Sequence, residues 1–115
     1  MALHSAKAFD RYIGTLTAAT ISEQWEAHVG KVGGKVFALC GNDGTPIVFK
    51  VSEMSFEGLT TLAGVGQAAY FAKRQWVSVD KGSELGDADL KAYIAASHGL
   101  IAAKLTRKLR AELGL

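Results

Sequence analysis

The sequence predicts a single α+β domain, residues 1–115, built as a two-layer sandwich. An antiparallel sheet of about five strands carries helices on one face. Short runs of alternating apolar and polar residues, separated by glycine turns, fill the middle of the chain and are typical of antiparallel strands. Both ends of the chain instead have apolar residues at helical spacing. A length of 115 residues is usual for one domain.

The first helix is predicted over residues 3–16, where the apolar residues recur about once per helical turn. These residues are Leu3, Phe9, Ile13 and Leu16. Gly14 and the threonines that follow it are poor helix formers, so we expect the helix to stop near Ala18.

A three-stranded antiparallel unit is predicted next. Residues 24–31 alternate as a half-buried strand does, and Gly33-Gly34 provides a two-residue turn into the second strand. Pairing across that turn sets Val29 opposite Ala38 and Ala27 opposite Cys40. The third strand, Ile47 to Val51, then pairs Ile47 with Cys40, Phe49 with Ala38 and Val51 with Val36.

This register sorts the strand residues onto two faces of the sheet. The face expected to meet the helices is almost entirely apolar: Trp25, Ala27, Val29, Val36, Ala38, Cys40, Ile47, Phe49 and Val51. The open face holds Glu26, His28, Phe37, Leu39, Val48 and Lys50. A slip of one residue would exchange the two sets, because side chains alternate along a strand.

The rest of the chain is predicted to be mainly helical. Ser52 is a good N-cap for a helix that ends at Gly64. A loop over 65–69 and short extended pieces over 70–72 and 75–80 follow. Asp87 is expected to cap the last helical region. We expect a break at Ser97-His98-Gly99 and a final helix over 100–113.

The composition limits the classes of protein. A single cysteine, Cys40, excludes an internal disulfide and fits a reducing compartment, so we expect a cytoplasmic protein. No apolar run approaches the ~18 residues of a membrane helix, and no membrane partner is expected.

We expect no catalytic constellation, metal or cofactor. The three histidines are scattered, and no glycine-rich phosphate motif is present. His28 and Cys40 lie on adjacent strands, but the predicted register puts their side chains on opposite faces. Cys40 is therefore interpreted as a buried apolar residue.

Cations gather in the second half of the chain. Residues 66–115 carry a formal net charge of +3, whereas residues 1–65 carry −1. The candidate nucleic-acid-binding residues are Lys31, Lys35, Lys73, Arg74, Trp76, Lys104, Arg107, Lys108 and Arg110. Lysines and arginines contact phosphates, and an aromatic ring beside them suits base stacking. The simpler interpretation is that the cations form a solvated face and the aromatic residues belong to the core.

Several blocks of the sequence together resemble the MmcQ/YjbR family of small bacterial proteins. They are Gly30 to Leu39, Val48 to Val51, Tyr70 to Val77 and the region from Leu85 through Ser97-His98. The resemblance implies a sandwich similar to frataxin/CyaY and to type III secretion chaperones. It also implies DNA binding, with wing-like hairpins as the contact. Iron binding is not carried over, since the first helix has only Asp10 in place of an acidic ridge.

The leading hypothesis is therefore a non-catalytic protein that contacts duplex DNA mainly through phosphates. The alternative is a protein-interaction or self-association module. Its homodimer or partner surface would be the open sheet face, with Phe37, Leu39 and Val48. An enzyme ranks third, because no site of the kind expected is visible.

Overall fold

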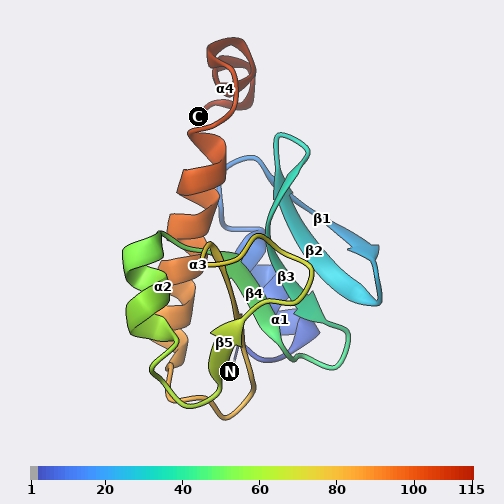
Figure 1. Ribbon diagram of the computed structural model, residues 1–115. Coiled ribbons are helices and arrows are strands. Elements are labelled where there is room, and N and C mark those ends of the chain that lie inside the picture. Colours follow the sequence, from blue (N-terminus) through green and yellow to red (C-terminus); the bar gives the residue numbers. More distant parts are fainter. Residues whose placement is uncertain (1–2) are drawn as a thin grey trace.

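The computed structural model describes residues 3–115 and confirms the α+β sandwich, with one strand more than predicted (Figure 1). The elements in order are α1 (Ala6–Ile13), β1 (Ala19–Gln24), β2 (Ala27–Val32), β3 (Lys35–Gly41), β4 (Ile47–Lys50), α2 (Glu53–Leu59), β5 (Val65–Gln67), β6 (Trp76–Val79), α3 (Asp87–Ala102) and α4 (Arg107–Leu113). The strands form one open antiparallel sheet in the order β1-β2-β3-β4-β6-β5.

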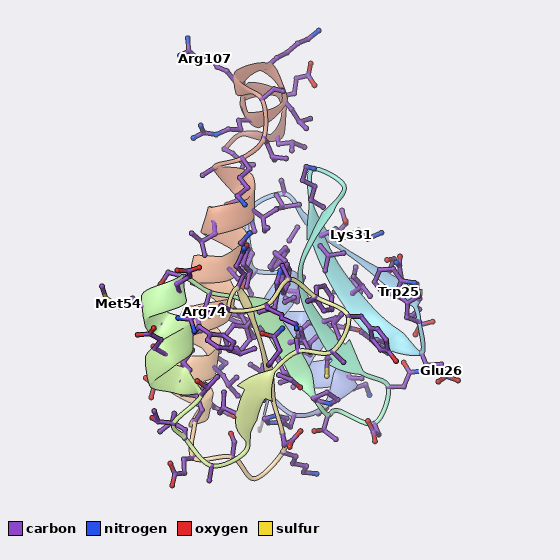
Figure 2. All side chains as sticks on the ribbon, viewed as in Figure 1. Trp25, Glu26, Lys31, Met54, Arg74 and Arg107 are labelled. Atoms are coloured by element: carbon purple, nitrogen blue, oxygen red, sulfur yellow. The ribbon has the colours of Figure 1, made fainter. Side chains whose placement is uncertain are left out.

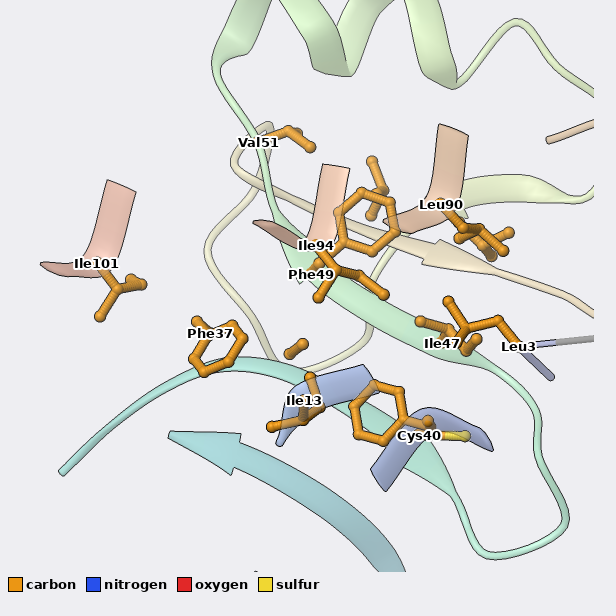
Figure 3. Packing of buried hydrophobic residues seen from close by; sticks show 14 of the residues in the cluster. Leu3, Ile13, Phe37, Cys40, Ile47, Phe49, Val51, Leu90, Ile94 and Ile101 are labelled. Atoms are coloured by element: carbon orange, nitrogen blue, oxygen red, sulfur yellow. The ribbon is translucent and has the colours of Figure 1, made fainter. Parts of the chain in front are cut away.

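The main core lies between the sheet and the helices. Phe37 and Phe49 come from the sheet, Ile13 from α1 and Ile94 from α3, and Figure 3 shows these four side chains together. All four are fully buried. Burial of several large apolar side chains at one interface is the main stabilising contribution to such a fold.

Two of the six strands, β1 and β5, were not predicted, and the extended piece predicted over 70–72 forms no strand. β1 pairs with β2 across a turn in which Trp25 and Glu26 have φ of 56° and 57°. Non-glycine residues seldom adopt this left-handed conformation, so the sequence gives no turn signal there. β5 is a short strand on β6, where a loop was expected. Tyr70, expected to be extended, has a φ of 69°.

The predicted register was correct on one side of β3 and wrong on the other. Cys40 pairs with Ile47 and Ala38 with Phe49, as expected. Between β2 and β3 the pairing is slipped by one residue, so that His28 lies opposite Cys40 and Val29 opposite Leu39. Val29 and Ala27 therefore share the open face with Leu39, and His28 turns to the helix side. Trp25, expected on the core face, is 68% exposed.

A β-bulge explains why Phe37 does not lie on the open face. The register shifts between Gly30 and Lys31, which leaves Phe37 without a residue opposite it. Its ring turns to the helix side and is fully buried there. Val36 packs on the other side with Val48, whereas Val51 belongs to the helix-side core and lies beyond the end of β4, so the predicted Val36–Val51 pair was wrong.

The helix ends differ from prediction at α3. Ser52 caps α2 as expected, accepting a hydrogen bond from the Ser55 amide. Gly86, however, is the N-cap of α3, and the Asp87 carboxylate accepts from the Leu3 amide instead. α3 continues through Ser97, Gly99 and Leu100, and the break falls at residues 103–106.

Ser97 explains the continuity of α3 through the predicted break. Its hydroxyl donates to the Phe37 carbonyl at 2.6 Å and accepts from the Lys50 amide at 2.9 Å. A fully buried hydroxyl thus joins α3 to the bulge of β3 and to the end of β4. The hydroxyl satisfies two backbone groups that the sheet itself leaves unpaired at this point.

Candidate functional site

The tip of the β2–β3 hairpin packs against the connection between α3 and α4. Gly33 has a φ of +58°, and a Cβ built there would lie 2.6 Å from the Leu105 Cδ1 atom. A side chain at this position would be strained by the backbone conformation and would have to displace the Leu105 side chain. The contact brings the lysines beside the tip, Lys31 and Lys35, to the end of the molecule that holds Lys104, as the hairpin and α4 in Figure 1 show.

Lys50 and Lys104 are in contact at the same end. The pKa of Lys50 is lowered to about 8, mainly by the Lys104 side chain beside it. Desolvation and repulsion by the Lys104 charge lower this pKa further. Two like charges close together repel each other, and an anion bound beside both would relieve that repulsion.

α4 adds the remaining cations. Thr106 caps it by accepting from the Leu109 amide, and Arg107, Lys108 and Arg110 are at least partly exposed. We define the basic end as the seven cations on the elements that meet here: Lys31, Lys35, Lys50, Lys104, Arg107, Lys108 and Arg110. The Lys31 amine turns to β1, where it donates to Gln24 Oε1 at 3.0 Å. Within residues 3–115, none of them forms a salt bridge.

Lys73, Arg74 and Trp76 are not part of the basic end. Arg74 donates to a Glu57 carboxylate oxygen at 2.6 Å and lies over the Phe56 ring. Figure 2 shows Arg74 beside α2, whereas Arg107 lies at the far end of the molecule on α4. Lys73 is exposed in the same loop as Arg74. Trp76 is 8% exposed and packs on Phe71, so its ring is not available for stacking.

The open face of the sheet holds an apolar groove, partly covered by the loop before β6. We define it by its lining residues: Trp25, Ala27, Leu39, Pro46, Val48, Ala69, Tyr70 and Phe71. Its volume is about 590 Å³. Leu39 and Val48 were expected on this face, and both do line the groove, whereas Phe37 does not.

The register brings Cys40 and His28 to the same face, contrary to prediction, but they do not form a nucleophile–base pair. His28 Nδ1 binds the Asp10 carboxylate at 2.8 Å, and its Nε2 faces Glu23 at 3.4 Å. Cys40 is fully buried, as expected, and burial raises the pKa of its thiol to about 12, with smaller effects from Asp10 and Asp43. A thiol with this pKa is not a nucleophile near neutral pH.

Two site features were missed in the sequence. Lys50 ends an apolar strand, and its position beside Lys104 depends on a contact between residues far apart in the chain. The groove depends on the turn at Trp25, which gives no sequence signal. Within residues 3–115, no cluster of three potential metal ligands occurs, and no helix is long and apolar enough to cross a membrane.

Comparison with known proteins identifies relatives by sequence family and by structure. The family model described as YjbR matches residues 14–100. The crystal structure of the Deinococcus radiodurans protein DR2400, with domain DUF419, has a TM-score of 0.88 at 22% identity, covering 98% of this chain and 90% of that one. A Pseudomonas syringae protein has a TM-score of 0.67 at 19% identity, covering 82% and 96%. No curated protein matches the chain significantly. At these identities the two structures show that the fold is shared.

Proposed function

The chain belongs to the YjbR family, and from that membership and its basic end we propose that it binds duplex DNA through phosphates, without catalysis. The observation that carries the proposal is the contact of Gly33 with Leu105. This contact sets the hairpin tip, with Lys35, beside the cations of the α3–α4 region, although about 70 residues of sequence separate them. Such a gathering of cations is the usual electrostatic signature of a phosphate-binding surface.

The charges of the basic end support the proposal further. Lys35, Lys104 and the three cations of α4 are accessible to solvent, so a phosphate can approach them. Because no described carboxylate pairs with them, their charges are available to an external anion. A cytoplasmic location, proposed from the buried thiol of Cys40, would give the protein access to DNA.

The proposed contact set is smaller than the sequence suggested. Trp76 is excluded because its ring is buried. Arg74 is excluded because Glu57 already compensates its charge, and Lys73 lies in the same loop. Contact is therefore proposed for the basic end alone, with sugar and phosphate as the targets and without base stacking.

Salt dependence tests the proposal directly. We expect a fluorescently labelled duplex to bind at about 50 mM salt, and the log–log plot of affinity against salt to fall by roughly one unit per phosphate contact. The measurement is fluorescence anisotropy over a salt series. Absence of binding to duplexes of several sequences at the lowest salt would end the DNA proposal.

The Lys50–Lys104 pair predicts a pH dependence of binding. Lys50 has a lowered pKa of about 8, so it is charged below this pH and becomes neutral as the pH rises through it. A phosphate favours the charged form, so affinity should fall, by about fivefold between about pH 7 and about pH 9 at constant salt. In Lys50→Arg, whose guanidinium stays charged, we expect the dependence to disappear. An equal pH dependence in the variant would assign the effect to another group.

The open-face module remains the alternative, in a reduced form. Phe37 cannot contribute to a partner surface, because it is buried on the helix side. Val48 is 5% exposed and Leu39 is half-buried, so together they offer a groove floor and no broad flat surface. This geometry favours a ligand that enters the groove over a homodimer formed across the whole face.

A further inference from the structure

The groove has a floor of small and branched apolar residues and walls of aromatic ones. Ala27, Leu39 and Val48 come from the sheet. Trp25, in the β1–β2 turn, forms one wall, and Tyr70 from the loop before β6 forms another. A volume of about 590 Å³ lies within the range of small-molecule binding sites.

Both wall residues are exposed aromatic side chains on strained backbone. Trp25 is 68% exposed with a φ of 56°, and Tyr70 is fully exposed with a φ of 69°. Neither ring belongs to a core cluster, so core packing does not explain why a large aromatic residue occupies either position. Left-handed backbone at a large residue costs free energy and occurs preferentially at ligand-binding sites.

One end of the groove is acidic. An adjoining hollow shares Trp25 and Pro46 with the groove and adds Glu26 and Asp43. Within residues 3–115, neither carboxylate forms a salt bridge. The Asn42 amide donates to the Glu26 carbonyl at 3.3 Å, which fixes the two acidic turns against each other.

We propose that the groove binds a small organic cation with an apolar body. The body would lie on the sheet between Trp25 and Tyr70, and the ammonium would meet Glu26, Asp43 and the face of the Trp25 ring. Aromatic faces attract cations, and unpaired carboxylates add to that attraction. An anion such as DNA phosphate is disfavoured at this acidic site, so the site is independent of the proposed DNA contact.

A pair of matched probes tests the charge requirement. Benzyltrimethylammonium carries a cation on an aromatic body, and neopentylbenzene is its neutral isostere. We expect the cation to bind at roughly millimolar concentration and the neutral probe at least about fivefold more weakly. Amide chemical shifts should move at Trp25, Glu26 and Tyr70. Because Trp76 is buried, Trp25→Phe should remove most of any change in tryptophan fluorescence.

Variants then separate the carboxylates from the aromatic wall. The double variant Glu26→Gln/Asp43→Asn should weaken binding of the cation by about fivefold and leave binding of the neutral probe unchanged. The control variant Asp89→Asn/Glu112→Gln also removes one Asp and one Glu charge, from exposed positions on α3 and α4, and should not change the affinity for either probe. Trp25→Ala should weaken the binding of both probes. Equal binding of cation and isostere, no effect of the first double variant, or shifts outside the groove would each overturn the proposal. The amide spectrum of each variant verifies its fold.

Discussion

Replacing Lys104, Arg107 and Lys108 by alanine is expected to weaken duplex DNA binding by roughly 10- to 100-fold at about 50 mM salt. These residues are exposed and form no salt bridge within the described chain, so the substitutions remove charge without breaking an ion pair. The log–log salt slope should fall by about three units, one for each phosphate that the variant no longer neutralises. Fluorescence anisotropy over a salt series measures both quantities.

The matched control removes three cations from elsewhere on the surface. Lys7, Arg11 and Lys81 are exposed and lie outside the basic end. Their replacement by alanine changes the net charge of the protein by the same amount. Affinity should fall only slightly, through the weaker long-range field. Equal reductions in affinity for the two triple variants would mean that net charge, and not the basic end, governs binding.

Ser97→Ala is expected to lower the free energy of unfolding by about 2–3 kcal/mol. The substitution leaves the Phe37 carbonyl and the Lys50 amide without their shared partner in a fully buried place. The same change should lower the melting temperature by roughly 10 °C, which calorimetry or denaturant titration can measure.

Ser55→Ala is the control for the Ser97 prediction. Ser55 is also a helical serine, but its hydroxyl makes no hydrogen bond with the described residues. We expect a change of less than about 0.5 kcal/mol. A similarly small effect at Ser97 would show that water replaces the missing hydroxyl and that the bulge tolerates the change.

The local parts of the fold could be predicted from the sequence, because their signals are local. The Gly33-Gly34 turn, the Ser52 cap and the Cys40–Ile47 pairing each depend on residues close together in the chain. The β2–β3 register could not be predicted, because the bulge at Phe37 changes which residues face each other. The turn type alone does not reveal an extra residue within a strand.

The basic end was predicted in part, and the groove was not. The cations of α4 are visible as a sequence cluster, and Lys31 and Lys35 flank an evident turn. The proximity of the hairpin to α4 depends on the Gly33–Leu105 contact, which joins residues far apart in the sequence. Lys50 was missed for the same reason. Trp76 was expected on the surface and is buried. The sequence pattern of an aromatic residue beside cations is the same whether the ring is buried or exposed.

The close approach of Gly33 to Leu105 has a mechanical consequence. Because the hairpin packs against the segment between α3 and α4, neither can move towards a ligand independently of the other. Cations held at fixed separations lose little entropy on association, and they match one spacing of phosphates better than others. A duplex whose groove width fits that spacing would be preferred by its shape, although no side chain reads a base.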